Sequence, residues 1–420
     1  MNIAIIGSGG REHALCFKLS ESKKVKKIFC FPGNAGTENI AKNININLSD
    51  FEELKKIILK NKIEMVIVGP EKPLVEGVVD YLEKNNILVF GPNKIAAQLE
   101  GSKTFTKELC KKHNIPTAEF EIFYKSEDAK KFLKTSKYPV VIKADNLAAG
   151  KGVYICENEL SGQNAIEEIF GGKFGKPEKL LIEEFLQGEE MSFFIISDGK
   201  SFKILETAQD HKRVGEGDIG KNTGGMGAYS PSLLINPNLQ KKIINKIIQP
   251  TLKSLNKIGC SYKGFLYAGL MIIKNEPYLI EYNVRMGDPE CQTIIPRLKT
   301  DLFEIILSCC KGYLKNLNLK WDPRYSLSIV LCSKGYPDKY EKNIRIEGLE
   351  NLVYSKNQFI FHAGTSKINN EILATGGRVL NFTTLSESFY LCQKKSIELI
   401  NNLNWNNGFY RKDIGYKVIK

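Results

Sequence analysis

Short apolar runs alternate with amphipathic segments over the first hundred residues of the chain. Four of these runs have the length of a buried strand: 2–7, 28–31, 65–68 and 87–90. Helical spacing of apolar positions is clearest between them over 50–62 and 75–84. Strands that alternate with helices predict a parallel sheet with crossover helices. Each run ends in a glycine-bearing turn, so we expect a binding crevice along the carboxyl edge of this sheet.

The rest of the chain has a mixed pattern. Helices are predicted over 100–113, 128–135 and 241–255, and strands over 140–142, 153–155, 264–273 and 277–284. Residues 211–231 are rich in glycine and lack apolar periodicity, which predicts a long loop, and such loops inside compact domains are usually functional. Strands dominate after about residue 322, with one helix over 386–402. The whole pattern predicts a multi-domain α/β protein.

The composition, 42% hydrophobic and 25% charged over 420 residues, is typical of a soluble globular protein with about two to four domains. The ten cysteines show no CxxC pair, which argues against a zinc site and for free thiols in a reducing compartment. We expect a cytoplasmic enzyme, because we find neither a signal-peptide pattern nor the ~20 consecutive apolar residues that span a bilayer.

The net charge of +13 raises the question of a nucleic-acid partner. The lysines are spread over amphipathic helices such as 51–62 and 241–257 and are not gathered in one arm. Net charge alone speaks to non-specific association and not to a site. We therefore expect no nucleic-acid partner, and the basic surface would instead help to gather anionic substrates.

The first glycine-rich turn, Gly7-Ser8-Gly9-Gly10-Arg11-Glu12, opens a helix whose N–H groups suit an anion. Gly7 and Gly9 match the dinucleotide fingerprint G-x-G-x-x-G, but Glu12 stands where the third glycine is required. That carboxylate would meet a pyrophosphate poorly, whereas Arg11 could pair with a single phosphate. The alternative is a tight turn without a ligand.

A second glycine-rich turn joins the predicted strands at 140–142 and 153–155. Lys143 stands near the end of the first strand, and Gly150-Lys151-Gly152 provides a backbone that can approach a phosphate closely. The spacing does not match the P-loop pattern G-x-x-x-x-G-K-[ST]. The alternative is an ordinary surface hairpin.

Two acidic segments complete the candidate chemistry. The segment 183–190, EEFLQGEE, turns at a predicted strand end, where free backbone groups could bond an adenine edge and a carboxylate could bond ribose hydroxyls. In "LIEYNVRMGDPE", Glu281 and Asn283 share one strand face and suit a hard cation such as Mg²⁺, and Arg285 adds a charge for an anion. A solvated turn or helix cap for the first segment, and an exposed cross-strand charge pair for the second, are the alternatives.

The order of these pieces resembles the ATP-grasp fold. Longer strings resemble one family within it: "GSGGREHAL", "PGNAGT", "VGPEKPLVEGVVD", "FGPNKIAAQLEGSKTFTK", "VIKADNLAAGKGV", "IEEFLQGEEMSF", "QDHKRVGEGDIGKNTGGMGAYSP", "RMGDPECQ", "FHAGT", "GGRVL" and "RKDIGY". They are similar to the phosphoribosylamine–glycine ligases (glycinamide ribonucleotide synthetases). The strings follow the family order from Met1 to Tyr416.

This resemblance implies a reaction that joins glycine to 5-phosphoribosylamine with ATP, through a glycyl phosphate, as the second step of de novo purine synthesis. Phosphorylation gives the carboxylate a good leaving group, so the protein needs only to position the substrates and offset their charge. The resemblance also favours a monomer without a membrane or nucleic-acid partner. A direct hand-over of the unstable amine from the preceding enzyme is left open.

The resemblance assigns a nucleotide site to Lys103, Lys143, Gly150, Lys151, Gly152, Glu183, Leu186 and Glu190. Lys143 and Lys103 would contact the phosphates, Glu183 and Leu186 the adenine, and Glu190 the ribose. The loop 147–152 would fold over the nucleotide and exclude water.

The metal and substrate residues follow in the same way. Glu281 and Asn283 would hold Mg²⁺ (or Mn²⁺) between the β and γ phosphates, and Arg285 would stabilise charge at the reacting carboxyl phosphate. Phosphoribosylamine would bind residues at the carboxyl edge of the first sheet: Gly9, Gly10, Arg11, Asn34, Gly36, Thr37 and Glu71. The segment 210–227, beginning with Asp210, would line the glycine and amine side. We interpret His13 and His211 as packing residues and not as general bases.

We expect three domains: an N-terminal α/β domain over 1–102, an ATP-grasp region over 103–324 with a lid at about 122–190, and a mostly β domain over 325–420. Other classes predict different features. A biotin-carboxylase-like ligase would lack "GGREHAL" and "NTGGMGAYSP". A dinucleotide-dependent oxidoreductase would need glycine at position 12. A nucleic-acid-binding module would show steeply salt-dependent affinity without magnesium nucleotide.

Overall fold

The structure is a computed structural model that describes residues 1–147, 152–175, 178–403 and 405–419. Its N-terminal part is a parallel sheet in the order β3-β2-β1-β4-β5. The strands are β1 (Asn2–Gly7), β2 (Lys27–Pro32), β3 (Lys42–Asn43), β4 (Met65–Val68) and β5 (Leu88–Phe90). The connecting helices are α1 (Gly10–Ser20), α2 (Phe51–Lys60), α3 (Glu71–Glu76) and α4 (Val78–Lys84). The predicted parallel sheet with crossover helices is confirmed.

The two faces of this sheet are covered by different helices because successive strand residues point to opposite sides. Ile3 and Ile5 of β1 pack in one buried cluster with Leu15 of α1. Ala4 and Ile6 pack in a second cluster with residues of α2 and α4. The helix predicted over 75–84 is in fact two helices, since Gly77, at φ 98°, breaks it with a left-handed turn.

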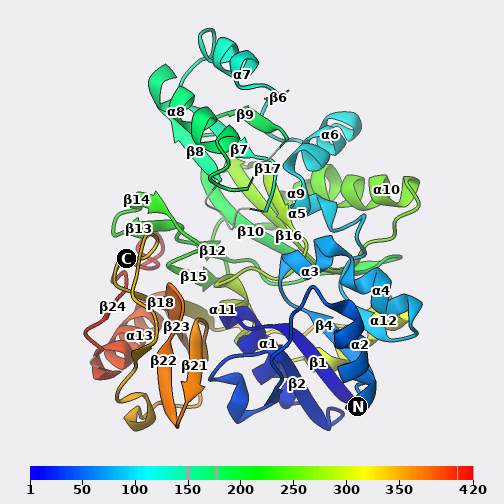
Figure 1. Ribbon diagram of the computed structural model, residues 1–420, viewed down its shortest axis with the longest axis vertical. Coiled ribbons are helices and arrows are strands. Elements are labelled where there is room, and N and C mark those ends of the chain that lie inside the picture. Colours follow the sequence, from blue (N-terminus) through cyan, green and yellow to red (C-terminus); the bar gives the residue numbers. More distant parts are fainter. Residues whose placement is uncertain (148–151, 176–177, 404, 420) are drawn as a thin grey trace.

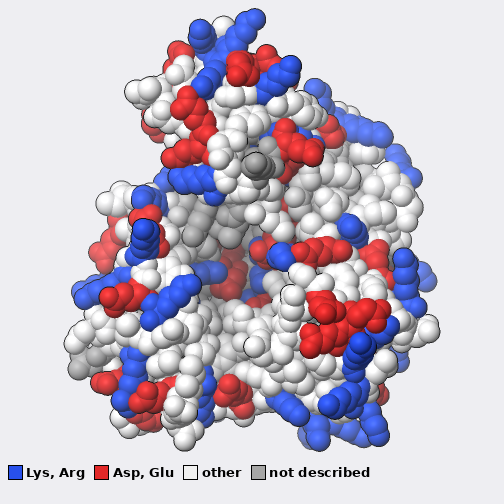
Figure 2. Space-filling view, viewed as in Figure 1, with Lys and Arg blue, Asp and Glu red and all other residues white. Residues whose placement is uncertain are grey.

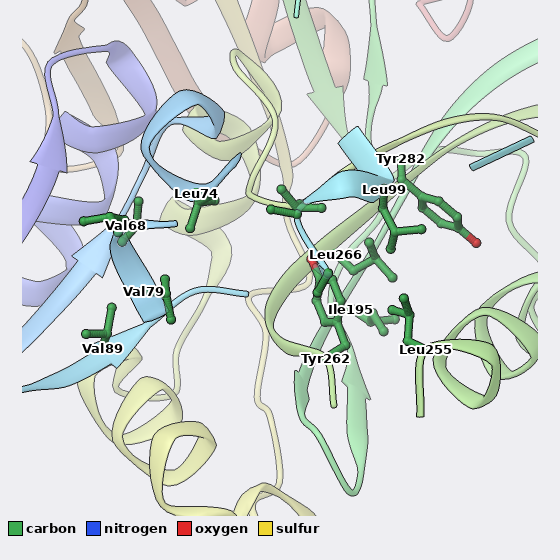
Figure 3. Packing of buried hydrophobic residues seen from close by; sticks show 14 of the residues in the cluster. Val68, Leu74, Val79, Val89, Leu99, Ile195, Leu255, Tyr262, Leu266 and Tyr282 are labelled. Atoms are coloured by element: carbon green, nitrogen blue, oxygen red, sulfur yellow. The ribbon is translucent and has the colours of Figure 1, made fainter. Parts of the chain in front are cut away.

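The central part is an antiparallel sheet in the order β11-β10-β16-β17. Its strands are β10 (Glu189–Asp198), β11 (Phe202–Ile204), β16 (Lys263–Ile273) and β17 (Glu276–Asn283). The flanking helices are α5 (Gln98–Gly101), α6 (Lys103–His113), α9 (Pro237–Ile243), α10 (Gln249–Lys257), α11 (Glu290–Ile294) and α12 (Leu302–Lys311). Ile195 and Leu266 join Leu255 of α10 and Val68 of the first sheet in one continuous core (Figure 3). The two sheets therefore do not pack independently.

The lid projects from this core as a small sheet of its own, in the order β6-β9-β7-β8 (Figure 1). Its elements are β6 (Phe120–Phe123), α7 (Ser126–Leu133), β7 (Val140–Ala144), β8 (Val153–Cys156), α8 (Glu159–Phe170) and β9 (Leu180–Glu184). Ile142, Ile166 and Ile182 belong to a separate buried cluster. Figure 2 shows that the molecular face is hollowed between the lid and the parts below it, with charged side chains inside.

The C-terminal part is built on an antiparallel sheet that includes β12-β15-β18-β23-β20, with β24 paired to β18. Its elements are β12 (Gln209–Asp210), β15 (Gly227–Ser230), β18 (Tyr325–Ser333), β20 (Gln358–His362), β23 (Arg378–Ser386), α13 (Phe389–Leu403) and β24 (Gly408–Phe409). A smaller sheet holds β19 (Ile344–Arg345), β21 (Thr365–Ile368) and β22 (Glu371–Ala374). No helix within the described ranges is long and apolar enough to cross a membrane.

Two further predicted elements differ from those observed. The predicted loop over 211–231 contains the hairpin β13 (Arg213–Gly215) and β14 (Ile219–Asn222), followed by β15. The sequence of β15 shows no alternation of apolar and polar residues. This segment is a strand because it pairs with β12 and β18, which the fold brings to either side of it. The helix predicted from 241 begins at Pro237, where the Asn236 side chain caps Leu239 N–H, and it passes through a π-helical turn at Ile244–Ile248 before α10.

Candidate active site

Two buried lysines, one in the lid and one on α6, share a carboxylate of the lid strand β9. Lys143 of β7 and Glu183 of β9 lie on neighbouring antiparallel strands, and their Nζ and Oε2 atoms are 2.9 Å apart. Lys107 of α6 approaches the same Oε2 atom at 3.0 Å. Burial alone would raise the pKa of Glu183, but the two ammonium groups hold it below its ordinary value. The cluster therefore contains an ionised carboxylate that does not face solvent.

Lys103 joins the start of α6 to the end of β7. Its Nζ donates to the carbonyl oxygens of Ala144 at 2.9 Å and Asn146 at 3.0 Å, at the start of the predicted nucleotide loop. Gly150 and Lys151 of that loop lie outside the described residues. Gly152 is buried, and its carbonyl accepts a hydrogen bond from Ala144 N–H at 2.9 Å. The structure thus brings Lys103 to the base of this loop.

Glu281 and Asn283 lie at the end of β17, where a one-residue bulge changes the alternation. Gly269 pairs with Glu281 and Leu270 pairs with Leu279, so Ile280 has no partner across the strand pair. The side chain of Tyr282 is buried on one face, and Glu281 and Asn283 therefore share the other. The bulge removes Ile280 from this alternation, so the predicted common face of the two oxygen donors rests on residues 281–283 alone.

Cations converge on Glu281 from several elements. Burial raises its pKa, but the nearby charges of four residues lower it below the ordinary value: Lys212, Lys143, Lys103 and Arg285. These residues come from β7, α6 and the segments around β12 and β17. A site that gathers so many cations around one carboxylate is suited to a polyanionic ligand.

Arg285 follows β17 and is held by two carboxylates. It donates to Glu100 Oε1 at 2.6 Å and to Glu71 Oε2 at 3.2 Å. Although burial raises the pKa of Glu71, the guanidinium groups of Arg285 and Arg11 bring it down to about 2. Burial raises the pKa of Glu100 to about 7, while Arg285 and the Val284 N–H favour its ionised form. The predicted substrate residue Glu71 thus lies beside the predicted catalytic Arg285.

The turn after β1 is closed by its own acidic side chain. Glu12 accepts hydrogen bonds from Gly9 N–H at 2.7 Å and from Arg11 Nε at 2.6 Å. A Cβ atom on Gly69 would lie 2.2 Å from Glu12 Oε1, so this side chain fills the space between the ends of β1 and β4. The geometry disfavours a dinucleotide pyrophosphate, as the sequence predicted. Arg11 also donates to Met286 O at 3.2 Å, beside Arg285.

The turn after β2 lies against the turn after β1. Asn34 Nδ2 donates to Ser8 O at 2.8 Å, and its Oδ1 accepts from Gly36 N–H at 2.9 Å and Thr37 N–H at 3.1 Å. A Cβ atom on Gly10 would lie within 2.5 Å of the side chains of Gln292 and Asn381. These predicted substrate residues meet at the carboxyl edge of the sheet, but the Asn34 and Thr37 side chains are occupied by protein contacts.

The remaining predicted residues lie around β10 and β12. Glu190 Oε2 is 2.6 Å from Lys212 Nζ. Burial and the carboxylate of Glu290 raise the pKa of Asp210 well above its ordinary value, and the buried Asp210 Oδ1 has no hydrogen-bond partner among the described residues. Leu186 is half-buried in the turn between β9 and β10. Asp210 is therefore a polar group that a ligand could satisfy.

Family models match almost the whole chain. They are described as phosphoribosylglycinamide synthetase N domain (residues 1–100), ATP-grasp (A) domain (101–291) and C domain (326–417). The chain belongs to the phosphoribosylglycinamide synthetase family. Enzymes of this ATP-grasp ligase family use ATP.

Several relatives of the family support this assignment. The chain is 46% identical to a phosphoribosylamine–glycine ligase of Haemophilus influenzae, covering 100% of this chain and 99% of the relative. A crystal structure of phosphoribosylamine–glycine ligase from Thermotoga maritima has a TM-score of 0.86 at 33% identity, covering 99% of this chain and all of that one. A biotin carboxylase structure from Campylobacter jejuni has a TM-score of 0.73 at 16% identity, covering 98% and 93%, and shows a shared fold alone.

Sequence reasoning missed three residues around this site: Lys107, Glu100 and Arg378. Glu100 and Lys107 lie on either side of Lys103 within "LEGSKTFTK". Lys107 stands four residues after Lys103 on the same predicted helix, and this i, i+4 spacing is a signal that could have identified it. Arg378 of β23 donates to Asp288 O at 2.6 Å, next to the predicted catalytic turn. No local pattern marks that contact, because it joins residues from distant parts of the chain.

Proposed function

We propose that this chain joins glycine to 5-phosphoribosylamine with ATP, giving N1-(5-phosphoribosyl)glycinamide, ADP and phosphate, as the second step of de novo purine synthesis. Membership of the phosphoribosylglycinamide synthetase family supports the ligase activity. The observation that carries the mechanism is the convergence of Lys103, Lys143, Lys212 and Arg285 on Glu281. This arrangement suits a triphosphate that must be held beside a reacting carboxylate.

The reaction needs two displacements. A glycine carboxylate oxygen attacks the γ-phosphorus, the bond to the β-phosphate oxygen breaks, and ADP leaves. The amine nitrogen of phosphoribosylamine then attacks the carbonyl carbon of glycyl phosphate, loses a proton, and phosphate leaves. Lys103 and Lys143 hold the triphosphate, and Arg285 stabilises the negative charge at the reacting carboxyl phosphate. Exclusion of water by the lid loop protects the acyl phosphate from hydrolysis.

The metal proposal rests on Glu281 and Asn283. Both are oxygen donors on one face at the end of β17, and the surrounding cations keep Glu281 ionised, so this pair fits Mg²⁺ or Mn²⁺. The ion, when bound, neutralises charge on the transferred phosphoryl group.

The nucleotide base and ribose are assigned to the turn after β9. Because the Glu183 carboxylate is enclosed by lysines, we propose that its main chain and the Leu186 side chain contact adenine, with Glu190 at the ribose hydroxyls. Gly150, Lys151 and Gly152 belong to the loop proposed to cover the phosphates.

The phosphoribosylamine site is assigned to the carboxyl edge of the first sheet. Gly9, Gly10, Asn34, Gly36 and Thr37 shape two adjacent turns there, and main-chain N–H groups in such turns suit a phosphate.

We assign Arg11 to the substrate phosphate. We assign Glu71, which lies next to Arg285, to the ribose of the substrate. Asp210 faces the glycine and amine side. Its Oδ1, which has no partner among the described residues, is available to an amine hydrogen.

We further propose domains over 1–102, 103–324 and 325–420, which the limits of the family models support. A monomer that works in the cytoplasm on small-molecule substrates agrees with this assignment. Hand-over of phosphoribosylamine from the preceding enzyme would spare this unstable amine from water.

The test is an ADP-release assay with ATP, Mg²⁺ and glycine, with and without phosphoribosylamine generated in the reaction. We expect ADP only with both co-substrates, together with a product of the mass of glycinamide ribonucleotide. ADP formation with other acid and amine pairs, but not with this one, would leave the ATP-grasp ligase in place and reject the proposed substrates.

A further inference from the structure

Lys107 is fixed in place by its surroundings. Its side chain is 3% exposed, and its Nζ approaches Glu183 Oε2 at 3.0 Å. The same ammonium donates to Thr117 Oγ1 at 2.6 Å and to Ala118 O at 3.5 Å. An ammonium has three donors, and these three acceptors account for all of them. Lys107 therefore has no donor left for a nucleotide.

Lys143 shares the same carboxylate but is held less tightly. Its Nζ lies 2.9 Å from Glu183 Oε2, and within the described part of the chain Glu183 is its one hydrogen-bonding partner. Its charge also helps to lower the pKa of Glu281. Lys143 thus has donors available for a phosphate, whereas its neighbour Lys107 does not.

The buried Glu183 carboxylate requires a neighbouring cation even when Lys143 is not bonded to it. Its side chain is 3% exposed, and its Oε1 atom has no hydrogen-bond partner among the described residues. A buried carboxylate that loses its counter-charge is strongly destabilised. If Lys143 were its only cation, any movement of Lys143 toward a phosphate would be opposed by the charge left behind.

We propose that Lys107 is a positioning residue for nucleotide binding, which holds the Glu183 carboxylate so that Lys143 can turn from Glu183 to the phosphates of ATP. The inference rests on the proposed function, because it assigns Lys143 to the nucleotide. Lys107 acts through Glu183 and Lys143 and does not itself touch the nucleotide.

The position of Lys107 between two sheets suits this role. Thr117, which accepts its hydrogen bond, donates in turn to Leu279 O of β17 at 2.6 Å. Leu279 precedes Glu281 by two residues on the same strand. One polar chain therefore runs from the metal-binding strand through Lys107 to the lid residue Glu183, and it fixes the lid carboxylate relative to the site.

The test compares binding of a non-hydrolysable ATP analogue with Mg²⁺ by calorimetry. In Lys107→Met, Glu183 retains Lys143, so we expect the Kd to rise about tenfold, a usual size for coupling within one ion-pair network. In Lys107→Met/Glu183→Gln, the Glu183 carboxylate no longer competes with the ATP phosphates for Lys143. We therefore expect the Kd of this double variant to return to within about threefold of the wild-type value. The single Glu183→Gln variant completes the cycle.

Lys111→Met is the matched control. Lys111 lies one turn further along α6, is exposed, and its Nζ lies 6.0 Å from the centre of the Phe120 ring that Lys107 also approaches. We expect no change in its Kd. If Lys107→Met does not fold in a thermal melt, Lys107→Gln removes the charge but keeps a donor, and the same result is expected of it.

The outcomes separate the two proposals. A wild-type Kd in Lys107→Met, or a double variant that binds no better than the single one, would give Lys107 a purely structural role and overturn the inference. If the wild-type protein itself fails to bind the analogue, the proposed function fails, and the inference falls with it.

Discussion

Arg285 donates from one guanidinium to two carboxylates, and the shorter bond, 2.6 Å, goes to Glu100. The Glu100 side chain is 8% exposed, and its other oxygen accepts Val284 N–H at 2.8 Å. Glu100 therefore holds both the charge and the main chain of the residues that follow β17. It thereby fixes the position of the Arg285 guanidinium.

Glu100→Gln should lower kcat/KM by about 10- to 100-fold, the scale of about 1.4–2.8 kcal/mol for a lost charge-assisted hydrogen bond. Because burial raises the Glu100 pKa to about 7, the wild-type pH profile should have a limb near neutrality that the variant loses. Steady-state kinetics from pH 6 to 9 measure both. Glu108→Gln, an exposed position on α6, is the control, and an unchanged profile in Glu100→Gln would reject this role.

Glu281→Gln should reduce turnover by about 10²–10³-fold and raise the Mg²⁺ concentration needed for half-maximal rate, since one ionised oxygen ligand is lost. A metal titration of the ADP-release rate measures both effects. Glu276→Gln, at the other end of β17 and paired with Lys242 and Lys246, should leave the metal dependence unchanged. Equal metal dependence in wild type and Glu281→Gln would place the metal elsewhere.

Arg378→Ala should raise the KM for glycine about tenfold and leave the KM for ATP unchanged. Arg378 donates to Gly224 O and to Asp288 O. It therefore holds the glycine-rich segment 211–231 against the turn that follows Arg285. The nucleotide lysines lie on other elements. Arg345→Ala, which removes an exposed arginine of the same C-terminal part, is the control. A matching rise in the KM for ATP would show a general loss of structure.

Stability should fall as the pH is lowered from about 6.5 toward 4, in part through His13 and His362. Burial and the neighbouring His362 lower the pKa of His13 to about 3. Burial lowers the pKa of His362 to about 4. Both are below the unfolded value of about 6.5, so in this window the unfolded chain binds protons that the folded chain does not. Each histidine then costs up to ~1.4 kcal/mol of stability per pH unit.

His13→Gln should flatten that dependence, because one of the two proton sites is removed. Its Nδ1 accepts His362 N–H at 2.8 Å, so the variant should also loosen the contact between α1 and β20. Urea unfolding at pH 4.5, 5.5 and 7 measures the slope. An unaltered slope in His13→Gln would contradict the assignment.

Much of the fold could be predicted because its signals are local. The apolar runs at 2–7 and 65–68 became β1 and β4, and the strand pair around Lys143 became the hairpin β7–β8. The interpretation of His13 and His211 as packing residues agrees with their burial and their contacts to His362 and Gly415. The break at Gly77 and the strand β15 were missed, because a left-handed glycine and a tertiary pairing leave no period in the sequence.

The sequence by itself determined the order of strands and helices, the common face of Glu281 and Asn283, and the family to which the motifs point. These depend on spacing along the chain, which periodicity and motif strings record directly. Only the tertiary structure decided that Lys107 and Lys143 share Glu183, that Glu100 holds Arg285, and that Arg378 reaches Asp288. Such contacts join residues tens to hundreds of positions apart, and their geometry is set by packing of the sheets and the lid, which no local pattern encodes.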